Sequence, residues 1–314
     1  MKWFAYVRIA RPDYWTNNVF IIPGVILGLF YAPHLNVSSM WIGILGGIVA
    51  SCLVASSNYV LNEILDASRD KFHPEKRNRP IVAGEVVLPL AYLEWLLLAA
   101  AAFGLGFVIQ PRLGGMIVVF WIAALLYNTP PVRFKDLPYA DVLSESVNNP
   151  IRMAIGWFST GIDVLPPVSI LLAYWAFGAF LMTMKRYAEY RMIRHSGMAG
   201  QYRSSFRHYS EERLMECVFF YGALFGMLSG FFMARYHIEL ILATPLVAYA
   251  MAYYMHLGFK LNSPVQHPER LYRERKLVLL SGLAFLACAV LLYVEIPVLE
   301  EWMAPWCRPL ARTP

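Results

Sequence analysis

The amino-acid sequence predicts an all-α, polytopic membrane protein in which nine transmembrane helices form a bundle. Hydrophobic residues make up 58% of the 314 residues and charged residues only 15%. The mean hydropathy is +0.47, unlike that of a soluble globular chain. Apolar runs long enough to cross a hydrocarbon core of about 30 Å recur along the whole chain. Basic residues are concentrated between alternate apolar runs, as they are in the short cytoplasmic loops of membrane proteins.

The apolar runs follow one another closely, which predicts a single integral-membrane domain over residues 1–314. The first ten residues lack the apolar core and cleavage pattern of a secretory signal, so we expect the first span to be retained. The four cysteines are scattered and match neither a zinc ligand set nor a disulfide framework. The expected spans cover residues 14–32, 39–62, 87–109, 113–128, 140–160, 168–186, 214–234, 238–258 and 277–299.

The basic residues predict the orientation of the bundle. Most of the 27 Lys and Arg residues lie near the N-terminus or in the segments after the second, fourth, sixth and eighth spans. The outer segments carry only Arg112, Arg235, Arg308 and Arg312. The N-terminus is therefore expected in the cytoplasm and the C-terminus outside. The net charge of +6 then reflects membrane topology, and no nucleic-acid partner is expected.

Asn62, Asp66 and Asp70 close the second span at i, i+4 and i+8 spacing. Such positions share one helix face over about 12 Å, so the amide and the two carboxylates point the same way. Mg²⁺ typically takes one or two carboxylates, keeps several waters and bridges to substrate phosphates. We therefore expect these three residues to bind Mg²⁺, because carboxylates at a membrane boundary commonly serve a substrate path.

A basic stretch follows directly and contains Lys76, Arg77 and Arg79. These cations would neutralise the rest of the charge on a bound diphosphate. The alternative is a solvated helix end followed by a charged loop with no ligand. The position of the preceding carboxylates at the membrane boundary favours the substrate site.

A second polar cluster connects the fourth and fifth spans. Tyr127 lies at the end of the fourth span and Lys135 in the connecting segment, and Asp141 and Glu145 share one face if the fifth span is helical. These four residues are candidate substrate contacts.

Arg152 lies further inside the fifth span and is also a candidate substrate contact. An arginine at that depth requires either an internal carboxylate partner, such as Glu145 or Glu189, or an anionic ligand. The sequence leaves both interpretations open.

The third cluster ends the sixth span and consists of Lys185, Arg186 and Glu189. Lys185 and Glu189 are i, i+4 neighbours, so a salt bridge on the helix surface would explain part of the pattern. Adjacent cations beside a lipid-lined cavity favour an anion site, since arginine presents a planar fork to phosphate oxygens. A fourth basic segment, from Lys260 to Lys276, is expected to anchor the protein at the membrane surface.

All four clusters lie on the predicted cytoplasmic face. The second and sixth spans each end in a charged cluster, and the fourth and eighth each end in a shorter loop that contains proline. This pattern predicts two four-span halves and a last helix, with the inner loops meeting at one central cavity open to the cytoplasmic side. The apolar interior would bind a lipid chain, and the loops would bind a charged head group.

These motifs resemble those of the UbiA superfamily of intramembrane transferases. Residues 62–70 (NEILDASRD) and 76–84 (KRNRPIVAG) look like its first motif and Arg-Pro-Gly tail, although Glu63 stands where Asp is common. The stretch from Tyr127 to Asp141 looks like the inner loop of that family. The resemblance implies a nine-helix bundle of UbiA type and transferase activity that depends on Mg²⁺.

Members of this superfamily that use prenyl diphosphates generally carry a second Asp-rich motif after the sixth span. No Asp follows Asp163 in this chain, and Lys185, Arg186 and Glu189 stand at the inner end of that span. The combination looks like the branch of polyprenyl-phosphate phosphoribosyltransferases. The resemblance therefore implies transfer of 5-phosphoribosyl from phosphoribosyl diphosphate to a polyprenyl phosphate, with release of diphosphate.

In the implied reaction, Mg²⁺ held by Asp66 and Asp70, helped by Asn62, would stabilise the departing diphosphate. Lys185 and Arg186 would hold the lipid phosphate in line, and Glu189 would orient them or bind a ribose hydroxyl. Asp66, Asp70 and Lys185 are thus the expected catalytic residues. The implied setting is a bacterial inner membrane with a cytoplasmic active site, and a homo-oligomer is compatible with it.

Two alternatives remain open at this stage. An aromatic prenyltransferase of the same fold would transfer a polyprenyl group from its diphosphate to an acceptor such as 4-hydroxybenzoate, with aromatic side chains around the carbocation. A non-catalytic lipid carrier or transporter would have the same cavity but no need for a metal site. The shared face of Asn62, Asp66 and Asp70 argues against the carrier.

Overall fold

The computed structural model describes the chain except for residues 1–2, 33–36, 72–75, 196–203, 261 and 304–314. The side chains of residues 37–39, 69, 76, 193–195, 204, 269 and 300 are also outside the description. Every regular element in the described residues is a helix, so the all-α prediction is confirmed. The α-helices are α1 (Trp3–Ala10), α2 (Ile22–Tyr31), α3 (Val37–Asp70), α4 (Leu88–Ile109), α5 (Pro111–Asn128), α6 (Ala140–Ser146), α7 (Asn148–Ser159), α8 (Val168–His195), α10 (Glu211–Tyr236), α11 (Thr244–Gly258), α12 (Arg275–Leu291) and α13 (Pro297–Met303).

Shorter 3-10 helices connect these elements. They are η1 (Pro12–Ile21), η2 (Lys76–Asn78), η3 (Phe134–Asp136), η4 (Ser204–Arg207), η5 (Ile238–Ala243), η6 (Pro264–Gln266) and η7 (Pro268–Arg273).

Six helices in the described part of the chain are long and apolar enough to cross a membrane. They are Met40–Ser68, Leu88–Ile109, Pro111–Asn128, Val168–Met192, Glu211–Tyr236 and Ile238–Gly258. Large apolar side chains on their outer faces, such as Val108 and Phe231, are 84% and 61% exposed. Faces of this kind suit contact with lipid tails, so the protein is an integral membrane protein.

The other three predicted spans are shorter or interrupted in the structure. Residues 14–32 form η1 followed by α2, and residues 140–160 form α6 and then α7. Proline explains the second break in part, because Pro150 in the first turn of α7 has no amide hydrogen to continue the preceding helix. The last span is reduced to α12, which has 17 residues. The count of nine spans therefore remains a prediction.

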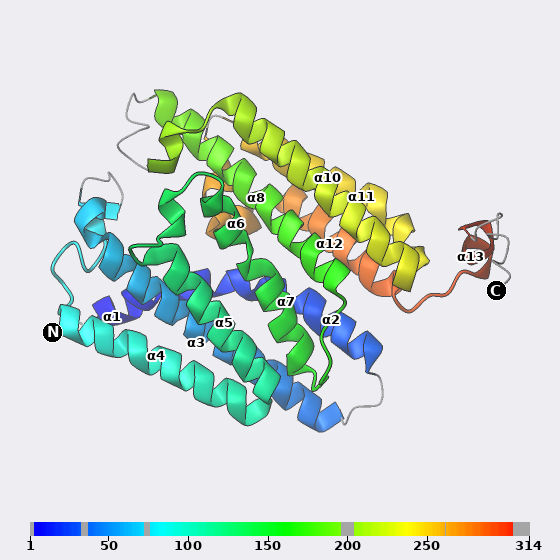
Figure 1. The fold of residues 1–314 in the computed structure, drawn as a ribbon, viewed down its shortest axis with the longest axis horizontal. Coiled ribbons are helices and arrows are strands. Elements are labelled where there is room, and N and C mark those ends of the chain that lie inside the picture. The colour runs from blue at the N-terminus through cyan, green and yellow to red at the C-terminus, as the bar shows by residue number, and fades with distance from the viewer. Residues whose placement is uncertain (1–2, 33–36, 72–75, 196–203, 261, 304–314) are drawn as a thin grey trace, which may run out of the picture.

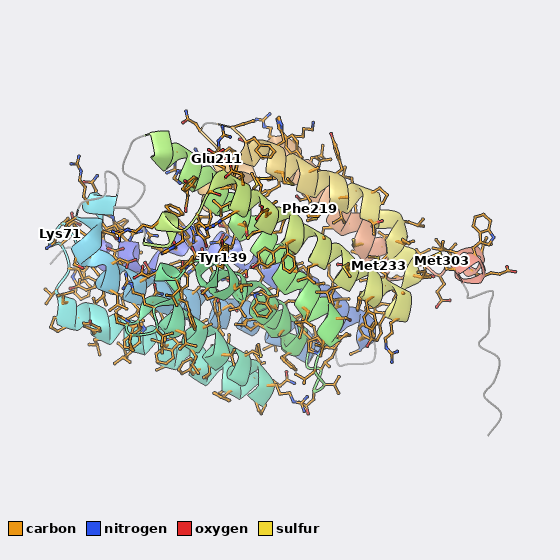
Figure 2. The ribbon with its side chains drawn as sticks, turned by 45° about the horizontal axis from the view of Figure 1, so that its top comes forward. Lys71, Tyr139, Glu211, Phe219, Met233 and Met303 are labelled. Carbon is orange, nitrogen blue, oxygen red and sulfur yellow. The ribbon has the colours of Figure 1, made fainter. Side chains whose placement is uncertain are left out.

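The helices pack as two neighbouring groups (Figure 1). In the first, α4 packs on α3 and α5, and α2 packs on α7. In the second, α10 packs on α8, and α11 packs on α12. The apolar core around Phe158 lies mainly in the first group but also includes Phe232 of α10, and a second core around Leu257 lies in the second group. Figure 2 shows Lys71 and Met303 toward opposite ends of the long axis, with Glu211, Phe219 and Met233 following one another along α10.

Candidate active site

A large cavity runs between the two helix groups. Its volume is about 2820 Å³, and its wall extends from Asp70 and Arg79 at one end of the bundle to Leu292 and Met303 at the other. Most of the wall is apolar, whereas charged and amide side chains gather near Asp70. A cavity with this division can hold a lipid chain at one end and a charged group at the other.

The polar end is where the connections after α3, α5 and α8 meet. Asp66 on α3 binds side chains from the segment after α5, and Arg186 on α8 binds Asp141 on α6. The segment after α11 joins them, since Gln266 Nε2 donates a hydrogen bond to the Ala188 carbonyl at 3.3 Å. The predicted convergence of the four polar clusters at one end of the bundle is thus seen in these contacts.

Asp66 is the centre of the first group of contacts. Its Oδ1 accepts hydrogen bonds from Arg133 Nη2 at 2.7 Å and from Lys135 Nζ at 2.6 Å. Arg133 also pairs with Asp136 at 2.9 Å. Both cations are buried, so the carboxylate offsets charge that would otherwise be costly in this environment.

Arg133 adopts a backbone conformation that is uncommon for a residue with a side chain. Its φ angle is 30°, in the left-handed region. The guanidinium compensates by reaching Asp66, Asp136 and the carbonyl of Asn128. Gly84, at the end of the first motif, has a φ of 70°, which explains glycine at that position.

Asn62 and Asp70 face the cavity on either side of Asp66. Asn62 Nδ2 donates a hydrogen bond to Asn128 Oδ1 at 2.6 Å. Asp70 Oδ2 accepts a hydrogen bond from Arg79 Nη1. Asn62, Asp70 and Arg79 belong to the cavity wall, whereas the Asp66 side chain is 18% exposed and lies behind it.

These oxygens fit a hard divalent cation. Asn62 Oδ1, Asp66 Oδ2 and Asp70 Oδ1 accept no hydrogen bond from the described residues. They therefore leave three oxygen donors on one helix face, which is the partial ligand set that Mg²⁺ completes with water and phosphate. Among the described side chains, no group of three or more His, Cys, Asp and Glu residues could hold a metal without such help.

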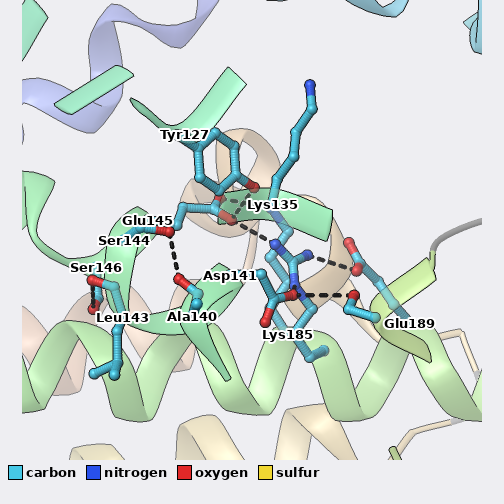
Figure 3. Close-up of polar contacts among 12 residues, drawn as sticks. Tyr127, Lys135, Ala140, Asp141, Leu143, Ser144, Glu145, Ser146, Lys185 and Glu189 are labelled. Carbon is cyan, nitrogen blue, oxygen red and sulfur yellow. Dashed lines mark hydrogen bonds and ion pairs between the residues drawn. The ribbon is translucent and has the colours of Figure 1, made fainter. Parts of the chain in front are cut away.

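The second group of contacts surrounds Arg186 (Figure 3). Its guanidinium donates to Asp141 Oδ2 at 3.1 Å, to Glu189 Oε2 at 2.7 Å and to Glu145 Oε2. Arg186 is only 2% exposed and does not reach the cavity wall. The group is held from the other side by Tyr127, whose hydroxyl donates to Glu145 Oε2 at 3.0 Å.

Lys185 is the cation of this group that faces the cavity. Its Nζ lies 3.7 Å from Glu145 Oε1, and its side chain is 17% exposed. Glu145 and Glu189 also belong to the wall. The i, i+4 ion pair considered between Lys185 and Glu189 does not form. Lys185 pairs with Glu145 instead, and Glu189 pairs with Arg186.

Tyr209 supports the same group and was not among the predicted site residues. Its hydroxyl donates to Asp141 Oδ1 and accepts the amide hydrogen of Tyr139 at 2.7 Å. Burial raises the pKa of Tyr209, and the neighbouring Asp141 carboxylate raises it further, so the phenol remains a hydrogen-bond donor. Asn128 was also not among the predicted site residues, because its hydrogen bond to Asn62, 66 residues away, depends on how α3 and α5 pack.

Arg152 lies elsewhere in the cavity wall. Its Nε donates to Asn18 Oδ1 at 3.1 Å, and its guanidinium carbon is 4.7 Å from the centre of the Phe120 ring. It forms none of the ion pairs found among the described residues. The internal partners considered from the sequence, Glu145 and Glu189, bind Arg186 and not Arg152.

The predicted site residues thus separate by position. Those in the cavity wall are Asn62, Asp70, Arg79, Tyr127, Glu145, Arg152, Lys185 and Glu189. Those that bind wall residues from behind or lie beside them are Asp66, Lys135, Asp141 and Arg186. Arg77 is exposed and is not part of the wall, and the Lys76 side chain lies outside the described residues.

Comparisons with known proteins identify the family of the chain. The family model of the UbiA prenyltransferase family matches residues 21–280. The chain is 28% identical to decaprenyl-phosphate phosphoribosyltransferase of Mycobacterium tuberculosis over 62% of each chain. It is also 28% identical to the protein of the same name from Corynebacterium glutamicum, over 65% of this chain and 59% of that one. The matched region therefore spans about three-fifths of the length of these relatives.

Solved structures share the fold. A UbiA homolog from Archaeoglobus fulgidus, bound to GPP and Mg²⁺, has a TM-score of 0.69 at 20% identity and covers 92% of this chain and 100% of its own. A structure of digeranylgeranylglyceryl phosphate synthase has a TM-score of 0.63 at 14% identity, covering 92% and 98%. At these identities the likeness shows a common helical architecture.

Proposed function

Because the chain belongs to the UbiA prenyltransferase family, we propose that it transfers 5-phosphoribosyl from phosphoribosyl diphosphate to a polyprenyl phosphate within a membrane. Transferase activity follows from the family and its relatives. The choice of donor and acceptor is the proposal. The active site would open to the cytoplasm of a bacterial cell, at the inner membrane, as the charge distribution predicts.

Lys185 in the cavity wall is the observation that carries this choice. It stands at the inner end of α8, where the resemblance implies that prenyl-diphosphate users begin a second Asp-rich motif. A fixed cation there, 17% exposed and beside Glu145, cannot ligate a second metal ion, so this end of α8 does not suit the second metal-bound contact expected of prenyl-diphosphate users. The names of the mycobacterial and corynebacterial relatives support the same choice.

The carboxylates around Lys185 suit a donor that carries hydroxyl groups. Glu145 and Glu189 both face the cavity, and carboxylates accept strong hydrogen bonds from hydroxyls. Ribose offers two such donors, whereas a prenyl chain offers none. We assign the sugar of the donor to this part of the wall.

Asn62, Asp66 and Asp70 would hold Mg²⁺ together with the diphosphate of the donor. The ion would neutralise the charge that builds up on the diphosphate as it leaves. Arg79, which pairs with Asp70 at the same wall, would contact phosphate oxygens there. Lys135 and Arg133 hold the Asp66 carboxylate in one orientation from behind.

The reaction is a substitution at the anomeric carbon of ribose. The bond from this carbon to the diphosphate oxygen breaks, and the diphosphate keeps the electron pair. A new bond forms to an oxygen of the lipid phosphate, which is ionised at neutral pH and needs no general base. The protein would contribute mainly by positioning both substrates and stabilising charge.

Aromatic prenyl transfer is the second candidate. It is favoured by the Archaeoglobus homolog, which is bound to GPP and Mg²⁺. Aromatic side chains such as Phe120, Phe177 and Phe180 also belong to the cavity wall. Aromatic rings can shelter a carbocation. Rings at these positions would equally pack against a lipid chain, so they do not favour one substrate.

Two parallel reactions test the proposal. Purified protein in lipid nanodiscs receives Mg²⁺ with labelled phosphoribosyl diphosphate and polyprenyl phosphate, or Mg²⁺ with polyprenyl diphosphate and 4-hydroxybenzoate. We expect lipid-linked phosphoribose from the first mixture and no prenylated ring from the second. A prenylated ring without lipid-linked phosphoribose would overturn the proposal. Asp70→Asn serves as the inactive control, matched by Asp163→Asn at the opposite end of the bundle.

A further inference from the structure

We propose that Arg152 is the residue that binds the phosphate of the lipid acceptor, deep in the cavity and inward of the diphosphate end. This inference rests on the proposed function, because it names where the second substrate of that reaction places its anionic group. It changes the expectation that Lys185 and Arg186 are the main contacts of the lipid phosphate.

Arg152 is the exception among the buried cations. Four Lys and Arg residues are buried in the described part of the chain: Arg133, Lys135, Arg152 and Arg186. Arg133 and Lys135 pair with Asp66, and Arg186 pairs with three carboxylates. Arg152, 8% exposed, pairs with none of the described carboxylates. A buried charge without a counter-charge is unfavourable unless a ligand supplies one.

The Arg152 guanidinium is held in one orientation by contacts that do not use its two terminal nitrogen atoms. Nε donates to Asn18, and one face of the group lies over the Phe120 ring. Nη1 and Nη2 donate no hydrogen bond to the described residues. Since Arg152 belongs to the cavity wall, this fork of donors is available to a ligand, and its geometry matches two oxygens of a phosphate.

Close packing between α2 and α7 sets this orientation. A Cβ on Gly156 would lie 2.2 Å from the Ile21 carbonyl oxygen, and one on Gly24 would lie 1.8 Å from the Met153 carbonyl oxygen. The two glycines therefore let the helix backbones touch at the level of Arg152. This contact keeps Asn18, on η1, beside the Arg152 side chain.

The neighbours of Arg152 leave its positive charge undiminished. Tyr59 and Tyr174 lie within electrostatic range of the Arg152 guanidinium, both belong to the wall, and both are neutral phenols. Around Lys185, by contrast, Glu145 and Glu189 face the same space. A dianionic phosphate is repelled there by the carboxylates, whereas at Arg152 it meets a cation and neutral hydrogen-bonding groups.

The depth of Arg152 suits the acceptor and not the donor. Phe120, which lies under the guanidinium, accepts a hydrogen bond from Asn58 through its carbonyl at 3.5 Å. Asn58 precedes Asp66 by two helical turns, or about 12 Å along α3. A ribosyl group between Asp66 and Arg152 would fill this interval. The wall residues that α10 and α12 contribute are mostly apolar, so an anion that enters this cavity is expected to carry an apolar chain.

Lipid binding without the donor tests the inference. Wild-type protein in nanodiscs is titrated with farnesyl phosphate and with farnesol, in the absence of Mg²⁺ and phosphoribosyl diphosphate. We expect the phosphate to bind at least tenfold more tightly than the alcohol. Arg152→Gln should abolish this preference, and Arg152→Lys should retain part of it. Arg235→Gln is the matched control, because Arg235 also lies over an aromatic ring, that of Tyr236, but is exposed and outside the wall.

Retention of the wild-type preference by Arg152→Gln would overturn the inference. If Arg152→Gln does not fold, Asn18→Ala keeps the cation but removes its anchor, and it should weaken phosphate binding without affecting farnesol. The inference would likewise be overturned if Asn18→Ala and Arg152→Lys both bind farnesyl phosphate with the affinity of the wild type. A further titration uses 4-hydroxybenzoate. If Arg152→Gln weakens binding of this carboxylate but not of farnesyl phosphate, Arg152 contacts an aromatic acceptor and the inference about the lipid phosphate is rejected.

The two proposals fail in different ways. If no phosphoribosyl transfer occurs but the phosphate preference depends on Arg152, the lipid site is correct and the donor is wrong. If transfer does occur, Arg152→Lys should raise KM for the lipid phosphate about tenfold or more and leave KM for phosphoribosyl diphosphate unchanged. A purely structural role of Arg152 would change both constants together or neither.

Discussion

Asn62 and Asn128 connect two membrane helices through one hydrogen bond, from Asn62 Nδ2 to Asn128 Oδ1 at 2.6 Å. Asn128 Oδ1 also accepts from Lys135 Nζ at 2.9 Å, and Lys135 in turn binds Asp66. The side-chain oxygen of Asn128, at the end of α5, thus positions the proposed metal ligand Asn62. It also positions Lys135, the cation that holds the second proposed ligand, Asp66. Loss of that oxygen should disturb the site more than the fold.

Replacing Asn128 with leucine tests this relationship. Asn128→Leu keeps a similar volume but removes the acceptor of the Asn62 amide and one of the acceptors of the Lys135 ammonium, which costs about 1–3 kcal/mol of stability. We expect turnover to fall by about ten- to a hundredfold, because a misplaced ligand weakens the stabilisation of the leaving diphosphate. The measurement is the initial rate over a range of Mg²⁺ concentrations, together with the unfolding temperature.

Gln110→Leu is the control for Asn128→Leu. Gln110 Nε2 donates to the Ile162 carbonyl at 2.8 Å, at the opposite end of the bundle. Its loss should lower stability by a similar amount and leave turnover near that of the wild type. Equal losses of turnover in both variants would show that Asn128 acts through stability alone.

The two aspartates of the first motif should be required for turnover. Asp70→Asn should leave folding intact, whereas Asp66→Asn also removes the counter-charge of the buried Arg133 and Lys135 and should be less stable. Asp66→Asn and Asp70→Asn each remove one charge from the proposed Mg²⁺ ligands, and we expect turnover to fall by at least about a hundredfold. Mg²⁺ binds the folded state, so it should raise the unfolding temperature of the wild type but not of Asp70→Asn. Differential scanning fluorimetry with and without Mg²⁺ provides this measurement independently of activity.

Asp163→Asn is the matched variant for both aspartates. Asp163 pairs with Arg112 at the other end of the bundle, and the pair is exposed, so its loss should affect neither turnover nor the response to Mg²⁺. A Mg²⁺-dependent shift that persists in both Asp66→Asn and Asp70→Asn would place the metal elsewhere.

The first motif illustrates what the sequence can predict. Helical spacing alone puts Asn62, Asp66 and Asp70 on one face, since a single regular helix joins them. The structure keeps them on α3, one helix from Val37 to Asp70. Hydropathy likewise identifies each of the six long apolar helices, because a membrane span requires continuous apolar residues.

The partners of these residues could not be predicted in the same way. Arg186 is separated from Asp141 by 45 residues, and Asp66 from Arg133 by 67. Such contacts depend on how the helices rotate and pack, which periodicity does not specify. Arg186 was therefore expected to face a substrate, whereas in the structure three carboxylates surround it behind the wall.

Gly156 should be intolerant of larger side chains because it lies against the backbone of η1. A Cβ there would meet the Ile21 carbonyl oxygen at 2.2 Å, and backbone at that distance cannot move aside as a flexible side chain can. We expect Gly156→Val to lower stability by about 1–3 kcal/mol or more through overpacking. Gly226→Val is the control, since nothing lies within 4 Å of a Cβ at Gly226 on α10. Similar unfolding temperatures for the two variants in nanodiscs would contradict this account of the α2–α7 contact.

Arg186 is predicted to be the more important of the two adjacent cations for stability. Arg186→Met would leave Asp141, Glu145 and Glu189 without their shared guanidinium, and breaking a buried ion pair in this way costs about 3–5 kcal/mol. Lys185→Met removes a cation that is partly exposed and lies 3.7 Å from the Glu145 carboxylate, so we expect a loss of at most about 1 kcal/mol. The measurement is the unfolding temperature of each variant in nanodiscs. If the loss in Arg186→Met comes from uncompensated charge, adding Asp141→Asn should recover part of it, whereas a loss that stems from packing would be increased by the second substitution.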